Sequence, residues 1–273
     1  MTLQHSEKPP LLQRVPISSI WDTFKFITLL GVIFWFVLLG TNQLGYNWQW
    51  YRVPQYIFTM TEGGLSWGPL MQGLGVTLQI TAISMVFMLL FGLTTALLRM
   101  SNSWVGQGLA RFYMELIRNS PLLIQLFFIY FVIAPIMDMS GFWAAVLALS
   151  LFEGAYASEV FRAGITSIDK GQWEAAKSLG MPPLEMYRHI ILPQAIRRVL
   201  PPLTSQAISL IKDSALVSTV AILDLTQRGR MIDAETFLTF EIWFTVAAIY
   251  LVITTTLSGL VNFMERRTKS ISL

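Results

Sequence analysis

The stretch EAAKSLGMPPLEMYRHIILP, residues 174–193, is the most informative part of this chain. It is the centre of a polar, helix-forming segment of about forty residues between two long apolar runs. Gly180 can adopt the left-handed conformation that ends a helix, and Pro182 followed by Pro183 permits a new first turn. We therefore predict a short helix over 169–179 and a second helix that runs to about 191, where Pro193 stops it.

The first of these predicted helices has a face suited to contact. Trp173, Ala176 and Leu179 recur at helical spacing and share that face. Ala175 and Ala176 are small enough to let another surface approach closely. The pair of helices would then form a rigid lever joined to two membrane helices, whereas an ordinary cytoplasmic connector would explain only the polarity of the segment.

The composition indicates a membrane protein. The 273 residues are 54% hydrophobic and 13% charged, with a mean hydropathy of +0.57, whereas a soluble domain carries nearly twice that charged share. The chain contains no cysteine, which excludes disulfides, thiolate nucleophiles and cysteine metal sites. The net charge of +3 is small and scattered, so nucleic acid is not an expected partner.

Six apolar runs are long enough to cross a bilayer, which needs about 20 mostly apolar residues. They cover residues 26–44, 73–98, 119–137, 142–164, 202–223 and 242–264. The second and sixth contain no charge. The first is short enough to resemble a signal peptide, but a long segment precedes it and no small-x-small cleavage site follows, which favours an uncleaved anchor. The predicted fold class is an all-α polytopic membrane protein with about six transmembrane helices.

The distribution of Lys and Arg predicts the orientation, because cytoplasmic loops carry an excess of basic residues. Of the 19 basic residues, all but Arg52, Lys212, Arg228 and Arg230 fall in the segments on one side of the six spans. Both termini and the 174–193 stretch are therefore expected to be cytoplasmic.

The external segment and the span that follows it each allow two interpretations. The external segment 41–69 is rich in rings that favour the headgroup zone, so it is expected to lie along the outer surface, either as an interfacial anchor or as a binding surface for a partner. In the next span, small and hydroxylated residues lie on one helical face, which suits either close helix packing or a substrate path. The rings are Tyr46, Trp48, Trp50, Tyr51, Tyr56 and Trp67, and the small residues are Gly73, Thr77, Thr81 and Ser84.

Polar side chains inside the predicted spans are candidates for a substrate pathway. Gln125 requires a partner in a waterless setting and would either bond to another helix or line the path. Glu153 carries a charge near the middle of its span, at a cost of about 3 kcal/mol, and a contact with Lys212 would neutralise it. Asp213 lies beside Lys212, and Tyr156 follows Glu153 by one turn. These residues form either a structural network or a substrate-contacting one.

A local ion pair is expected nearby. Glu159 and Arg162 are i, i+3 neighbours close to the cytoplasmic end of the fourth span. This pair is predicted to be structural.

Seven positions of the opening stretch follow the spacing E-A-A-x3-G-x9-I-x-L-P, and this spacing resembles the coupling loop of ABC importer permeases. The residues are Glu174, Ala175, Ala176, Gly180, Ile190, Leu192 and Pro193. Five further segments are similar to the polar-amino-acid branch of the type I importer permeases: LMQGLGVTLQITAIS, IRNSPLLIQLFFIYF, EGAYASEVFRAGI, LPPLTSQAISLIKDSALVS and LDLTQRGRMIDAETFLTFEIW. The resemblance covers about residues 69–267.

The resemblance implies a domain organisation. A five-helix transporter domain would cover 69–267, with its coupling loop at about 165–200. The chain departs from the family pattern in its N-terminal part, where a tail at 1–25 precedes an extra span and the external segment over 26–68. A short tail, 268–273, would follow the core.

The resemblance also implies partners and a location. Two ABC ATPase subunits would receive the coupling loops, in which Trp173 joins the seven positions above, and a periplasmic or surface protein would deliver the amino acid. The chain has no G-x-x-x-x-G-K-[ST] motif, so ATP and Mg are expected on the partner ATPase, and this chain is expected to bind no cofactor and to catalyse nothing. A second permease chain, identical or a sister, would supply the second loop in the bacterial inner membrane.

The expected function is the ATP-driven import of a polar amino acid by alternating access. Glu153 and Lys212 suit the ammonium and carboxylate of any zwitterion, so the identity of the amino acid stays open. A secondary transporter or channel for a small polar solute is the alternative, although no inverted repeat is visible. A membrane enzyme would have only His5 and His189 available for histidine chemistry.

Overall fold

A computed structural model describes residues 17–43, 45–61 and 64–270. The chain divides into two compact units, Met1–Trp48 and Gln49–Leu273, and each is described by itself. Part of the predicted N-terminal tail, with Lys8 and Arg14, and the end of the predicted C-terminal tail lie outside the described residues.

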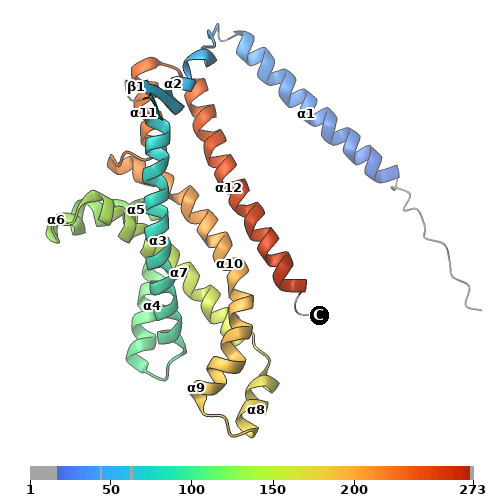
Figure 1. The fold of residues 1–273 in the computed structure, drawn as a ribbon, viewed down its shortest axis with the longest axis vertical. Helices are drawn as coiled ribbons and strands as arrows, with labels where there is room; N and C mark the ends of the chain where they lie inside the picture. Colours follow the sequence, from blue (N-terminus) through green and yellow to red (C-terminus); the bar gives the residue numbers. More distant parts are fainter. Residues whose placement is uncertain (1–16, 44, 62–63, 271–273) are drawn as a thin grey trace, which may run out of the picture. The chain divides into compact units, whose positions relative to one another are not determined.

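The first unit contains one long helix, α1 (Ile17–Gln43) (Figure 1). It includes residues 26–43 of the apolar run predicted at 26–44 and begins earlier, with Asp22 and Lys25 forming an ion pair one turn apart at 3.4 Å. Trp21, Phe24 and Phe36 are exposed on its surface. These exposed rings suit a helix in contact with lipid.

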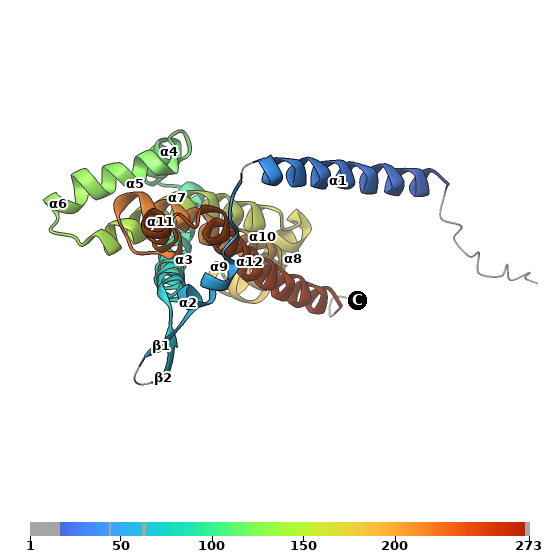
Figure 2. The same ribbon diagram turned by 90° about the horizontal axis from the view of Figure 1, so that it is seen from above.

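The second unit begins with short elements and a small sheet. A 3-10 turn (Trp50–Arg52) and α2 (Pro54–Ile57) lead into β1 (Phe58–Thr61), which pairs antiparallel with β2 (Gly64–Trp67). Figure 2 shows this hairpin projecting sideways from the helices. The sequence predicted a surface segment here but not a hairpin.

Two long helices, α3 (Pro69–Met100) and α7 (Gly141–Thr166), form the centre of the unit. They approach closely at Gly92, where an added Cβ would lie 2.8 Å from the Cβ of Ala157. The stripe of small residues on α3 is buried: Ser84 donates to the Val146 carbonyl at 3.4 Å, and Thr77 accepts from the Leu225 amide at 3.1 Å. The stripe is therefore a packing seam.

The span predicted at 119–137 is part of a bent pair of helices. α4 (Trp104–Arg118) meets α5 (Leu122–Phe128) at 107°, and the second arm continues through a π-helical turn (Ile129–Ile133) into α6 (Ala134–Ile136). Pro121 is in an extended conformation at the break. Because proline has no N–H and its ring clashes with the preceding turn, the helix stops before it.

The prediction that Pro193 stops a helix is wrong. After α8 (Lys170–Ser178), α9 (Pro183–Met186) and a π-helical turn (Tyr187–Ile191) lead directly into α10 (Leu192–Asp213). Pro193 is in the first turn of α10, where the missing N–H is not needed. The span predicted at 202–223 does not correspond to one helix. α10 begins before it and passes through Pro201 and Pro202, and a 3-10 segment (Ser214–Val220) follows Asp213.

The chain ends with α11 (Leu225–Thr236) and the long α12 (Thr239–Ser270). Among the described residues, three helices are long and apolar enough to cross a membrane, and the bent pair would make a fourth. The three are α3, α7 and the 239–259 part of α12, which confirms the spans predicted at 73–98, 142–164 and 242–264 as membrane-crossing candidates. The all-α polytopic fold class is confirmed, with the β1–β2 hairpin as an addition.

Candidate functional site

The predicted coupling loop, residues 165–200, has a small hydrophobic core of its own. Its buried residues come from the end of α7, from α8 and α9, and from the start of α10. Ala176 is fully buried in this core, against the expectation that it would receive another surface, whereas Ala175 is exposed. The core is formed by Ile165, Ile168, Ala176, Met186, Ile191 and Ala195. The loop is therefore a compact body attached to α7 and α10.

Both ends of α8 are capped, and the sequence predicted the glycine at the second end. Asp169 accepts a hydrogen bond from the Gly171 amide at 2.7 Å, which satisfies a free donor of the first turn. Gly180 has a φ of 71°, and its amide donates to the Lys177 carbonyl at 2.9 Å. A Cβ at Gly180 would meet no heavy atom within 4 Å. Glycine is required there by the backbone conformation rather than by lack of space.

The tip of the loop presents an exposed surface of mixed character. Leu179 is 78% exposed and Leu184 is 80% exposed, and Glu174 and Gly180 are exposed as well. Two large exposed leucines beside charged groups are typical of a surface that another protein covers. Leu184 was not selected from the sequence, because it falls at one of the nine unspecified positions between Gly180 and Ile190 in the family spacing.

The remaining predicted loop residues have different roles. Trp173 is half-buried and its ring contacts that of Tyr187 edge-on, with centroids 5.4 Å apart. Ile190 is half-buried against the loop core, while Leu192 and Pro193 are exposed on the first turn of α10. Trp173 and Ile190 therefore stabilise the loop, and Leu192 and Pro193 remain accessible.

A second candidate site surrounds Glu153 in the middle of α7. Its side chain is 1% exposed, and its carboxylate accepts a hydrogen bond from Gln206 Nε2 on α10 at 2.8 Å. The side chain of Asp213 also lies beside this carboxylate. Because Gln206 and Asp213 are seven residues apart, they lie on the same face of α10. This spacing was the signal that could have identified Gln206 from the sequence.

The expected contact between Glu153 and Lys212 is not formed. Lys212 is exposed, and these two described residues form no ion pair with each other. The reason is the geometry of α10, since adjacent residues of a helix point about 100° apart and Asp213 occupies the side nearer to Glu153. A buried carboxyl next to a second carboxyl, with one neutral amide bound, is suited to accept a cation.

Gln125 stabilises the bend between α4 and α5. Its Nε2 donates to the Ile117 carbonyl at 2.7 Å, to the Ser120 carbonyl at 3.0 Å and to Ser120 Oγ at 2.9 Å. Carbonyls at the end of a helix have no partner within it, and Gln125 supplies the donor here. Of the two alternatives for Gln125, these contacts favour the bond between helices.

Tyr156 lies beside a cluster of charges at the contact of α3, α4 and α7. Its ring is 5.5 Å from the Arg118 guanidinium, and it lines a polar pocket of about 330 Å³ that Glu153 does not line. Glu159 bonds to Arg162 at 3.0 Å, as predicted, and also to Arg99 at 2.6 Å and to Arg118 at 3.5 Å. The ion pair predicted within one helix thus joins three helices.

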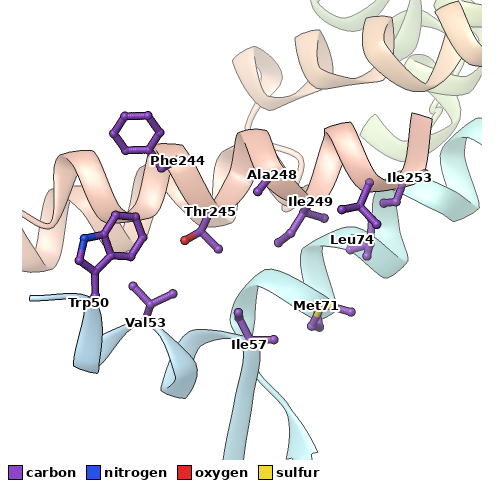
Figure 3. A pocket seen from close by; sticks show the side chains of 11 residues that line it. Trp50, Val53, Ile57, Met71, Leu74, Phe244, Thr245, Ala248, Ile249 and Ile253 are labelled. Carbon is purple, nitrogen blue, oxygen red and sulfur yellow. The ribbon is translucent and has the colours of Figure 1, made fainter. Parts of the chain in front are cut away.

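An apolar groove of about 750 Å³ lies at the other end of the unit (Figure 3). Trp50, Val53 and Ile57 face Phe244 and neighbouring residues of α12 across it, with Met71 and Leu74 from α3 at the end. The groove presents few polar groups and no charge, so it is unsuited to a zwitterion. Among the described ranges, no group of three or more His, Cys, Asp or Glu side chains could hold a metal ion.

Comparisons with known proteins agree with this architecture. Residues 88–270 match the family described as binding-protein-dependent transport system inner membrane component. The glutamine transport system permease protein GlnP of Escherichia coli (strain K12) is 37% identical over 203 residues, which cover 73% of this chain and 93% of that protein. The arginine transport system permease protein ArtQ of Bacillus subtilis (strain 168) is 36% identical over 203 residues, which cover 74% of this chain and 93% of that protein.

Solved structures share the fold. A crystal structure of an amino acid ABC transporter with histidines superposes with a TM-score of 0.68 and 40% identity, over 73% of this chain and 94% of that chain. An inward-facing conformation of the MetNI methionine ABC transporter superposes with a TM-score of 0.64 at 20% identity, over 73% of this chain and 95% of that chain. At that lower identity, the likeness shows the fold alone.

Proposed function

The chain belongs to the family of binding-protein-dependent transport system inner membrane components and is the permease subunit of an amino-acid ABC importer, and we propose that it moves a polar amino acid by alternating access. The observation that carries this mechanism is the compact 165–200 loop. It joins α7 to α10, has its own core and exposes Leu179 and Leu184 at its tip. A rigid body of this kind can transmit a push to both helices.

The partner that pushes is an ABC ATPase subunit, which receives the exposed tip in a surface groove. ATP and Mg bind to that partner, since this chain has no phosphate-binding loop motif, and the permease itself is not catalytic. Each chain offers one such loop, and a pair of ATPases needs two. A second permease chain, identical or a sister, completes the assembly, and an external binding protein delivers the substrate.

The proposed location is the bacterial inner membrane, with both termini and the 165–200 loop in the cytoplasm. The excess of Lys and Arg in the segments on the loop's side supports this orientation. The hairpin, α2 and the start of α3 then face the outside, together with Arg52 and α11.

The substrate site is proposed around Glu153, Gln206 and Asp213. Two carboxyl groups facing one amide suit the ammonium group of an amino acid, and the exposed Lys212 suits its carboxylate. Relatives are named for glutamine and arginine transport, which makes these two amino acids the first candidates. Gln125 and Tyr156 are assigned to the supporting structure of the pathway, on the basis of their contacts at the bend and the Glu159 cluster.

Reconstitution of the complete importer tests this function. The permease, its ATPase and its binding protein are placed in lipid vesicles, and ATP hydrolysis is measured with glutamine, arginine, histidine and an uncharged sugar. One of the amino acids is expected to stimulate hydrolysis and to accumulate inside, whereas the sugar is not. Accumulation without ATP would contradict the ATP-driven mechanism.

A further inference from the structure

The β1–β2 hairpin has one apolar face and one hydroxylated face. Phe58 pairs with Trp67 and Met60 pairs with Leu65 in the register of the two strands. Because side chains alternate along a strand and paired residues point the same way, these four side chains share one face. Thr59 and Ser66, which pair with each other, lie on the opposite face.

The apolar face is the more exposed of the two. Met60 is 84% exposed, Leu65 67%, Trp67 59% and Phe58 44%, and the rings of Phe58 and Trp67 lie 5.5 Å apart. On the other face, Ser66 Oγ donates to the Thr59 carbonyl at 3.1 Å. An isolated two-stranded hairpin is only marginally stable in water and requires a hydrophobic partner, so something must cover these four side chains.

The position of the hairpin indicates what covers it. β2 ends at Trp67, and α3 begins its membrane crossing at Pro69. The amide of Gly68, between them, donates to the Ile57 carbonyl at 2.8 Å, which ties the base of the hairpin to the end of α2. Figure 1 shows the hairpin at the end of α3 that begins with Pro69, and Figure 2 shows it extending away from the helix axis. At the end of a membrane span, a sideways projection lies over lipid.

We propose that the apolar face of this hairpin inserts into the outer interface of the bilayer and anchors the outer end of α3. No residue of β1 or β2 carries a charge, and residues 62–63 between them add only that of Glu62, whereas surfaces that bind soluble proteins reversibly have a polar rim. Phe and Trp rings beside Met and Leu match the composition of membrane-interface anchors. The hydroxyl groups of Thr59 and Ser66 then face water.

Single cysteines test this placement, because the chain contains none of its own. Met60→Cys and Leu65→Cys probe the apolar face, and Thr59→Cys and Ser66→Cys are matched controls on the same strands. Each variant carries a nitroxide label in the complete importer, reconstituted in phosphatidylethanolamine–phosphatidylglycerol vesicles. The ratio of accessibility to oxygen, which enters lipid, over accessibility to a water-soluble nickel chelate is measured by electron paramagnetic resonance.

The ratio is expected to be several-fold higher at positions 60 and 65 than at positions 59 and 66, with and without the binding protein. Equal ratios on the two faces would overturn the proposal. So would strong exposure of positions 60 and 65 to the nickel chelate that disappears only when the binding protein is added, because that result would assign the face to a soluble partner. Chromatography of each labelled complex before reconstitution checks its assembly.

Discussion

Gly180 ends α8 with a backbone conformation that costs a residue with a Cβ about 1–2 kcal/mol. The free space around it means that a larger side chain is excluded by the backbone and not by a clash within the chain. A glycine can be required by its backbone conformation or by lack of space for a side chain, and substitution can distinguish these two requirements.

Gly180→Val is expected to abolish substrate-stimulated ATP hydrolysis by the complex while membrane insertion stays normal, because valine strongly disfavours φ near 71°. Gly180→Asn is the matched control, since asparagine tolerates this conformation, and it should keep most of the stimulation. The measurement is ATPase activity with and without substrate. Normal stimulation in Gly180→Val would contradict the role of the loop as a lever.

Glu153 gives a prediction about transport. Glu153→Gln keeps the shape and a hydrogen-bond partner for Gln206 but removes the charge, so the KM for uptake should rise about ten-fold, which corresponds to about 1.4 kcal/mol of lost binding. The double variant Glu153→Lys with Lys212→Glu is expected not to recover uptake, because no ion pair joins these residues. Unchanged kinetics in Glu153→Gln would make Glu153 a structural group.

Asp224, the N-cap of α11 outside the candidate spans, gives a pH prediction. Burial raises its pKa from 3.8 to about 6, although its carboxylate accepts a hydrogen bond from the Gln227 amide at 2.8 Å. A carboxyl with a raised folded-state pKa contributes stability at low pH that is lost as the pH rises through about 6. Between pH about 7 and about 5, the melting temperature of the wild type should therefore increase relative to that of Asp224→Asn. Parallel pH profiles for the two proteins would exclude this titration.

At the scale of elements, the contact of α3 with α7 depends on small residues. Gly92 faces Ala157 and the Gly154 carbonyl so closely that no Cβ fits without movement. Gly75 lies on the same helix, where a Cβ would meet no heavy atom within 4 Å. The two glycines thus provide a matched pair.

Gly92→Val is expected to destabilise the purified protein by about 1–3 kcal/mol, as overpacking of a close contact does. Gly75→Val should have little effect, because its side chain would point into open space. Thermal unfolding in detergent, followed by size-exclusion chromatography, measures the difference. Equal losses in both variants would show that helix propensity, not packing, dominates at these sites.

The bend between α4 and α5 is a second feature at this scale. Pro121 interrupts the helix, and Gln125 then satisfies the carbonyls that the interruption leaves free. A polar side chain inside a membrane segment is thereby explained by its partner, without any contact to substrate. The same logic applies to Glu159, whose carboxylate joins Arg99, Arg118 and Arg162.

At the scale of the whole molecule, the orientation in the membrane decides which partners can reach which surface. Ser178 on α8 and Tyr51 before α2 are both exposed. In the cysteine-free chain, Ser178→Cys should react with a membrane-impermeant maleimide only in inverted vesicles, and Tyr51→Cys only in intact cells. The reverse pattern would place the 165–200 loop outside the cell and contradict the proposed function.

Local features of the chain were predictable because their causes are local. The apolar runs of α3, α7 and α12, the cap at Gly180 and the pair of Glu159 with Arg162 depend on residues that are close in sequence. The spacing from Glu174 to Pro193 was enough to identify the family. By contrast, Pro193 was predicted to stop a helix, because sequence shows the missing N–H but not that the proline would lie in a first turn.

The amino-acid sequence by itself determined that this protein is a helical membrane permease of the ABC importer family. The tertiary structure alone decided that Ala176 is buried in the loop, that Gln206 binds Glu153, and that the hairpin has an exposed apolar face. The physical reason is that hydrophobicity and backbone preference act on neighbours along the chain. Burial and pairing depend on which distant segments the packing brings into contact.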